Sequence, residues 1–158
     1  MISQIVRIVA VGLMLGALSV MAEQSENKKV SIVDAVSGKV NPSEKEKLAV
    51  AATEKWLGIV DAGKYGESWK EAAELFRNAI KQDQWEQAVQ TVRKPLGKLV
   101  SRKVKSTSYE ISLPGAPDGE YVVIEFETSF ENKKAAIETV TPMMDKDGKW
   151  RVSGYFIK

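Results

Sequence analysis

Glu138 is the side chain best placed to do chemistry, because it stands alone among apolar neighbours. It lies in the stretch 134–144, where residues alternate between two faces, and one face carries Ala136, Glu138, Val140 and Met144. If that face packs against the protein interior, the carboxylate is buried, and an isolated buried charge is very costly. A buried carboxylate therefore needs a partner, and with one it can act as a pocket acid or as half of an ion pair.

Two arginines are the natural partners of this carboxylate. Arg93 lies near the end of a helical pattern and Arg102 near the start of the strand region. We predict that Glu138 faces the helices and is paired with Arg93 or Arg102. Such a pair is interpreted either as structural, holding a helix to the sheet, or as a clamp in a ligand pocket. An exposed Glu138 is the third alternative.

Two tyrosines complete the candidate ligand pocket. Tyr65 precedes a helical pattern in a loop, and Tyr155 lies in the last strand-like stretch. A phenol beside a carboxylate in a dry pocket is suited to proton transfer. No residue is assigned as catalytic. The candidate ligand-binding residues are Glu138, Arg93, Arg102, Tyr65 and Tyr155.

The composition excludes several kinds of chemistry. The chain has no Cys and no His, so it lacks the best zinc and copper ligands, a thiol nucleophile and the base of a Ser-His-Asp triad. We therefore expect no metal and no cofactor. The stretch 145–148 begins like a calcium loop but lacks the further ligands and the closing glutamate. A formal net charge of +2 gives no support for nucleic-acid binding, which usually needs a pronounced basic excess.

Six cations nevertheless gather within residues 93–105. In a protein of the cell envelope they are suited to an anionic surface component. The alternative is cross-strand pairing of Lys103 and Lys105 with Glu125 and Glu127 on the following strand. We favour this pairing, because the chain as a whole is nearly neutral.

Three apolar stripes with helical spacing come first in the region 43–158. They run through Trp56, Trp69 and Trp85, whose rings are predicted to form core rather than a ligand site. Ahead of each stripe lies a residue that can cap a helix. A glutamate stands three positions after that residue. These pairs are Ser43 with Glu46, Ser68 with Glu71, and Asp83 with Glu86. We predict three helices that begin at these caps.

After Gly97 the apolar period changes to two, which is typical of strands. Turn sequences separate the stretches 99–113, 120–130, 134–144 and 149–157. In the first stretch the apolar positions change from even to odd numbers, so we expect a bulge near 105–108 that bends the strand. The predicted fold class is α+β, with three N-terminal helices packed on one face of a curved four-stranded antiparallel meander. Strongly bent long strands let a sheet curl around helices and leave a conical cavity between them, but the sequence does not tell whether this chain has one.

The first 22 residues predict export. They contain one cation, Arg7, an uncharged apolar run from 8 to 21, and Val20 and Ala22 at the positions of a signal-peptidase site. The apolar run is shorter than the ~20 residues that span a bilayer, so we expect cleavage after Ala22 rather than a retained anchor. The predicted organisation is a signal peptide (1–22), a flexible leader (23–42) and one domain (43–158). The mature protein is expected to be periplasmic or secreted and not an integral membrane protein.

The sequence also resembles a known family. The residues that carry the resemblance are Trp56, Asp61, Gly63, Tyr65, Ser68, Trp69, Phe76, Trp85, the run 93–97, the run 113–115, Asp118, Gly119, Tyr121, Phe130, the run 138–140, Trp150, Gly154 and Tyr155. Over about residues 48–158 the chain resembles the bacterial family called domain of unknown function 4019. The resemblance implies no catalytic residue. The order of helices and sheet resembles, more loosely, the nuclear transport factor 2-like and cystatin-like folds, which include both enzymes and binding modules.

Three functional hypotheses follow from these features. The first, which we favour, is an exported binding protein that takes a small apolar ligand or another envelope component. The second is a small proton-transfer enzyme of the isomerase or dehydratase type, using Glu138 with Tyr65 or Tyr155. The third is a structural or stress-related protein that interacts through an exposed sheet face.

Overall fold

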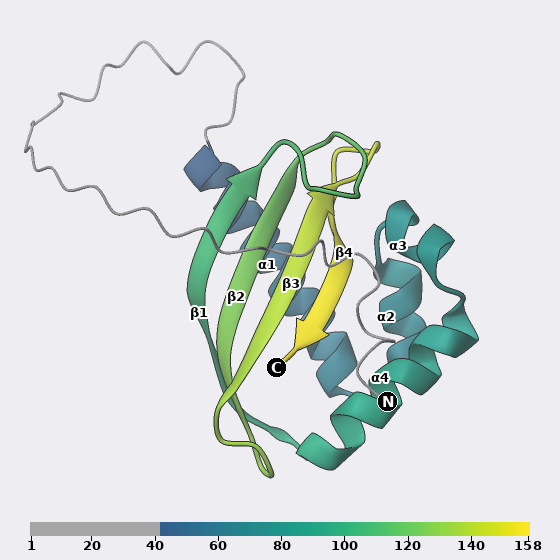
Figure 1. Ribbon diagram of the computed structural model, residues 1–158, viewed down its shortest axis with the longest axis vertical. Coiled ribbons are helices and arrows are strands. Elements are labelled where there is room, and N and C mark those ends of the chain that lie inside the picture. Colours follow the sequence, from purple (N-terminus) through teal and green to yellow (C-terminus); the bar gives the residue numbers. More distant parts are fainter. Residues whose placement is uncertain (1–41) are drawn as a thin grey trace, which may run out of the picture.

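Helices form the first half of the folded region and strands the second half (Figure 1). The computed structural model describes residues 42–158; the predicted signal peptide and nearly all of the predicted leader lie outside these residues. The helices are α1 (Pro42–Asp61), α2 (Tyr65–Glu71), α3 (Glu74–Ala79) and α4 (Gln82–Leu96). The strands are β1 (Leu99–Glu110), β2 (Tyr121–Phe130), β3 (Ala136–Met144) and β4 (Trp150–Ile157).

The four strands form one antiparallel sheet in the order β1-β2-β3-β4. Figure 1 shows α1 running behind the sheet, while α2, α3 and α4 gather beyond the β4 side. Alternate residues of β2, including Ile124 and Phe126, are buried and pack with Trp56 and Leu57 of α1 in one core cluster. The predicted α+β fold class and the antiparallel meander are therefore confirmed.

The predicted bend in the first strand is also confirmed. In the pairing of β1 with β2, Val104 lies opposite Phe126 and Ser106 lies opposite Glu125. Lys105 therefore has no residue of β2 directly opposite its Cα. One extra residue on one strand is a β-bulge, which bends the strand and increases its twist. A second irregularity lies between Leu99 and Ser101.

The second predicted helix is divided in the structure into α2 and α3. Ala72 and Ala73 have extended ψ angles of 164° and 153°, and the N–H of Ala73 donates to the carbonyl of Val152 in β4 (2.9 Å). Alanine favours helix, so this backbone contact with the sheet, and not local propensity, ends α2.

All three predicted caps lie inside a helix rather than before it. Ser43 is the second residue of α1. Ser68 lies inside α2 and Asp83 inside α4, and the residues that precede these helices are Lys64 and Lys81. The Ser68 hydroxyl instead accepts a hydrogen bond from the Trp85 indole (3.0 Å). Within residues 42–158, no helix combines the length and hydropathy required to cross a bilayer.

Candidate functional site

Glu138 is the third of the nine residues of β3 and is completely buried, with 0% of its surface exposed. Its neighbours across the sheet are Phe126 in β2 and Ile157 in β4. Ala136 and Val140, which share its face of the strand, are also buried. Glu138 therefore faces the helices, as predicted from the alternation of the strand.

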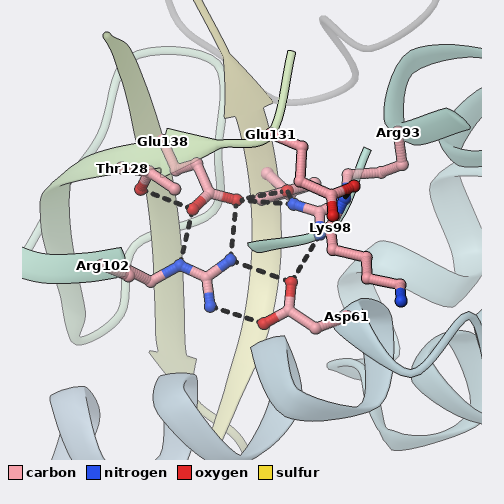
Figure 2. A network of polar contacts seen from close by, with 8 residues as sticks. Asp61, Arg93, Lys98, Arg102, Thr128, Glu131 and Glu138 are labelled. Carbon is pink, nitrogen blue, oxygen red and sulfur yellow. Dashed lines mark hydrogen bonds and ion pairs between the residues drawn. The ribbon is translucent and has the colours of Figure 1, made fainter. Parts of the chain in front are cut away.

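Both oxygens of this carboxylate accept several hydrogen bonds (Figure 2). Oε1 accepts from Arg93 Nη1 (3.3 Å), from Arg102 Nη2 (3.2 Å) and from the Tyr155 hydroxyl (2.6 Å). Oε2 accepts from Arg102 Nε (2.6 Å) and from the Thr128 hydroxyl (2.7 Å). A carboxylate offers about four lone-pair sites, so these contacts use its accepting capacity fully.

Asp61, the last residue of α1, is the second acid of the cluster, and its side chain is 18% exposed. Its Oδ1 accepts from Arg93 Nη2 (2.6 Å) and Arg102 Nη2 (3.0 Å), and its Oδ2 accepts from Arg102 Nη1 (2.7 Å). Arg102 thus bridges Glu138 and Asp61 (Figure 2). Two guanidinium groups meet two carboxylates, so the formal charges cancel, which offsets the cost of burying them.

Five elements beside α1 position these groups. Arg93 lies in the last turn of α4, and its guanidinium also lies over the ring of Phe130, 4.4 Å from the ring centre. Gly97 then turns the chain into β1 with φ 74° and ψ −161°, a conformation that is almost restricted to glycine. Arg102 in β1 lies directly opposite Thr128 in β2. Glu138 comes from β3 and Tyr155 from β4. The cluster therefore joins the ends of two helices to the inner face of the sheet.

Burial and mutual contact shift the pKa values of two groups of the cluster, Tyr155 and Arg102. Burial, together with the charge of Glu138, raises the pKa of Tyr155 well above its ordinary value. Burial acts to lower the pKa of Arg102, but its hydrogen bonds to Asp61 and Glu138 outweigh that effect and the pKa lies above the ordinary value. Tyr155 is therefore held as a neutral donor and Arg102 as a cation.

The predicted ion pair is confirmed, and Glu138 contacts both arginines rather than one of them. Tyr155 joins them, as the candidate pocket required. Tyr65 does not: it is the first residue of α2 and packs, half-buried, against the hydrophobic core. In the described part of the chain, Tyr65 makes none of the contacts of this network. That these residues bind a ligand remains a prediction.

Sequence reasoning missed Asp61 and Thr128 as members of the cluster. A signal for Asp61 was available, because two arginines around one buried acid leave an unbalanced positive charge. Asp61 also ends a helix, where the helix dipole disfavours a negative charge, so a tertiary partner was to be expected. Thr128 lies on the inward face of β2, where a hydroxyl also needs a partner.

A second feature is an open groove of about 400 Å³ between α1 and β1. Its lining is partly apolar, through Val50 and Ala51 of α1 and Val104 of β1, and Val104 is 40% exposed. Polar side chains of both elements complete it. The lining residues are Ser43, Glu46, Lys47, Val50, Ala51, Glu54, Val104 and Thr107.

The basic stretch at the start of the sheet is largely neutralised. Lys103 pairs with Glu127 (3.3 Å) and Lys105 with Glu125 (3.5 Å), as the cross-strand interpretation predicted. Among residues 42–158, no group of three or more carboxylates is arranged to hold a metal ion.

The fold and the buried cluster define a small α+β domain whose helices are joined to the sheet by two arginines and two acids. Residues 52–155 match the family described as protein of unknown function (DUF4019), and the chain belongs to this family. No curated protein and no solved structure gave a match. The looser likeness to nuclear transport factor 2-like and cystatin-like folds is therefore not confirmed.

Proposed function

We propose that this protein is an exported, non-enzymatic binding protein. The buried charges hold its fold together, and the surface around α1 and β1 makes the contact with a partner. The observation that carries the proposal is the saturation of Glu138: each oxygen already accepts from at least two donors.

A proton-transfer enzyme needs a carboxylate with a free lone pair aimed at the substrate. Glu138 is instead enclosed by Arg93, Arg102 and Tyr155 and is fully buried. A substrate proton would have to displace a guanidinium contact to reach either oxygen. This geometry favours a structural role for Glu138 over the role of a pocket acid.

The surface supports contact with another polypeptide. β1 is an edge strand, and Val100, Val104 and Ile111 along or just beyond it are exposed by 59%, 40% and 70%. The groove described above lies beside this strand. Exposed apolar side chains next to an open sheet edge are typical of protein interaction sites.

Site-specific photo-crosslinking in intact cells tests this proposal. A photoreactive residue is placed at Val104 in the full chain, and at Lys146 as a control, because Lys146 is an exposed residue in the turn between β3 and β4. We expect a discrete adduct with another polypeptide from position 104 alone. The absence of an adduct from position 104, or the same adducts from both positions, would contradict the proposal.

A further inference from the structure

Two acidic residues and one apolar residue form a row on the side of α1 that lines the groove. Glu46, Val50 and Glu54 are four residues apart along the helix and all three line the groove, so they follow one another on the same face. Each step along this row is about 6 Å. Alternate residues of an extended chain are about 6.7 Å apart. A short extended segment can therefore place its alternate side chains opposite all three.

The two acids of this row lack counter-charges. In the described part of the chain, neither Glu46 nor Glu54 has an ion pair or side-chain hydrogen bond. Some acids elsewhere on the surface are paired, as with Glu67 and Lys64, or Glu127 and Lys103, whereas Glu46 and Glu54 share one groove without such a pair among the described residues. The row is therefore complementary to a partner that brings one positive charge to each end and an apolar side chain to the middle.

The open edge of β1 favours an extended partner over a helical one. β2 lies on one side of β1, and within residues 42–158 no strand lies on its other side. Half of the backbone N–H and C=O groups of such a strand point outward. At the opposite edge, Ala73 already bonds to Val152 of β4, so that edge is partly covered.

The bulge at Lys105 limits the length of strand that the edge can accept. Bulges and lysines protect edge strands from pairing with long flat strands, and β1 has both. A segment of about five residues spans only about 13 Å, so the regular stretch 106–110 of β1 is sufficient for it. α1 runs beside this stretch, since Lys45 Nζ bonds the Tyr109 hydroxyl (3.2 Å).

We propose that the groove between α1 and β1 binds an extended peptide segment of the pattern basic–x–apolar–x–basic. The two basic side chains pair with Glu46 and Glu54, the apolar side chain contacts Val50, Ala51 and Val104, and the backbone lies along β1. This inference rests on the proposed binding function and names the chemistry of its partner.

Two synthetic peptides test the charge pattern. The full mature chain is titrated at low salt with labelled Thr-Lys-Thr-Val-Thr-Lys-Thr and with Thr-Glu-Thr-Val-Thr-Glu-Thr, and binding is followed by fluorescence polarisation. We expect the lysine peptide to bind, more weakly as salt is raised, and the glutamate peptide to bind at least about fivefold more weakly, as loss of two exposed ion pairs implies. Equal binding of the two peptides would overturn the inference.

Matched variants locate the contact. Glu46→Gln with Glu54→Gln is expected to weaken the lysine peptide about fivefold, and Glu46→Lys with Glu54→Lys is expected to reverse the preference between the peptides. The control is Glu71→Gln with Asp83→Asn, which makes the same change of charge on α2 and α4, and it is expected to bind as the parent does. An unchanged affinity of the Gln double variant would overturn the inference.

A displayed library of random short peptides separates this inference from the proposed function. Enrichment of peptides that require Val104 but carry no basic residues would overturn the charge pattern and leave a binding function intact. A library that yields no binder, together with no crosslink from position 104, would overturn the binding function itself. A dimer in sedimentation that the Gln double variant dissociates would assign the groove to a second copy of the chain and likewise overturn the inference.

Discussion

A carboxylate that two guanidinium groups share is costly to remove, because each arginine then stays in a poorly hydrated site with less counter-charge. Glu138→Ala is therefore expected to lower the free energy of unfolding by about 3–5 kcal/mol. Glu138→Gln is expected to cost less, because the amide oxygen still accepts from a donor such as Tyr155. Urea unfolding followed by tryptophan fluorescence measures both changes.

The matched control for these variants is Glu125→Gln on the outer face of the sheet, where the pair with Lys105 is partly exposed. Its effect is expected to stay within about 0.5 kcal/mol. If Glu138→Gln is as stable as this control but loses a binding or catalytic activity, the structural role of Glu138 is wrong and the pocket-acid interpretation returns.

Tyr155 makes the stability depend on alkaline pH. Burial beside Glu138 raises its pKa in the folded state, while in the unfolded chain it titrates near about 10. The stabilising contribution is therefore complete below about pH 10 and is lost as the pH rises through the folded pKa, with a slope of up to about 1.4 kcal/mol per pH unit. Tyr155→Phe cannot lose this contribution, so the stability difference between parent and variant is expected to shrink above about pH 10. If plots of the free energy of unfolding against pH run parallel for parent and variant above about pH 10, Tyr155 is not the group responsible.

At the scale of elements, Gly97 holds the connection between the two arginines. A Cβ at this position would lie 2.8 Å from Glu131 Oε2 and 2.9 Å from its Cβ, in a backbone conformation with φ +74°. Gly97→Ala is therefore expected to cost at least about 2 kcal/mol from the strained backbone and the close contact with Glu131 together. Gly63→Ala is the control, since φ is +73° there but nothing lies within 4 Å of the added Cβ, and about 1 kcal/mol is expected. Thermal and urea unfolding of the two variants compare them; equal losses would show that contact with Glu131 is unimportant.

The elements that sequence patterns predicted are those whose shape is determined locally. Alternation located the strands, and the change of parity located the bulge at Lys105, because a pleated strand has a strict period of two. The division between α2 and α3 was not predictable, because it falls at two alanines, which favour helix. Its cause is the hydrogen bond from the N–H of Ala73 to the carbonyl of Val152 in β4. The role of Ser68 was not predictable either, because its hydroxyl accepts the Trp85 indole N–H from another helix.

The same distinction holds for the candidate site. Arg93 and Arg102 were predictable because a buried acid on an apolar face requires a cation. Asp61 and Thr128 each need a polar partner on sequence grounds, but which partner each one contacts depends on the three-dimensional meeting of α1, β1 and β2. The groove between α1 and β1 joins residues about fifty positions apart, and no periodicity within either element indicates that they lie side by side.

At the scale of the whole molecule, the two ends of α1 contribute to different features, the ion network and the open groove. The last residue of α1, Asp61, closes the charge network against β1, while the first half of the helix lines the groove beside the free sheet edge. Loss of the network should therefore reduce the stability of the whole domain, whereas changes at Glu46 and Glu54 should leave stability nearly unchanged, because they contact no partner in the described residues. This separation allows the binding variants above to be interpreted without a folding defect.

The compartment of the whole molecule is a prediction from residues that precede the domain in the sequence. The apolar run 8–21 and the small residue Ala22 predict cleavage between Ala22 and Glu23, so we expect intact mass analysis of the protein from the envelope fraction to give a chain that begins at Glu23. Ala22→Arg removes the small residue that the cleavage site needs, and is expected to retain the longer chain in the membrane fraction. Ala35→Arg, the same change beyond the site, should be cleaved as the parent is. A parent protein that keeps residues 1–22, or an Ala22→Arg variant that is cleaved normally, would show that the predicted signal peptide is wrong.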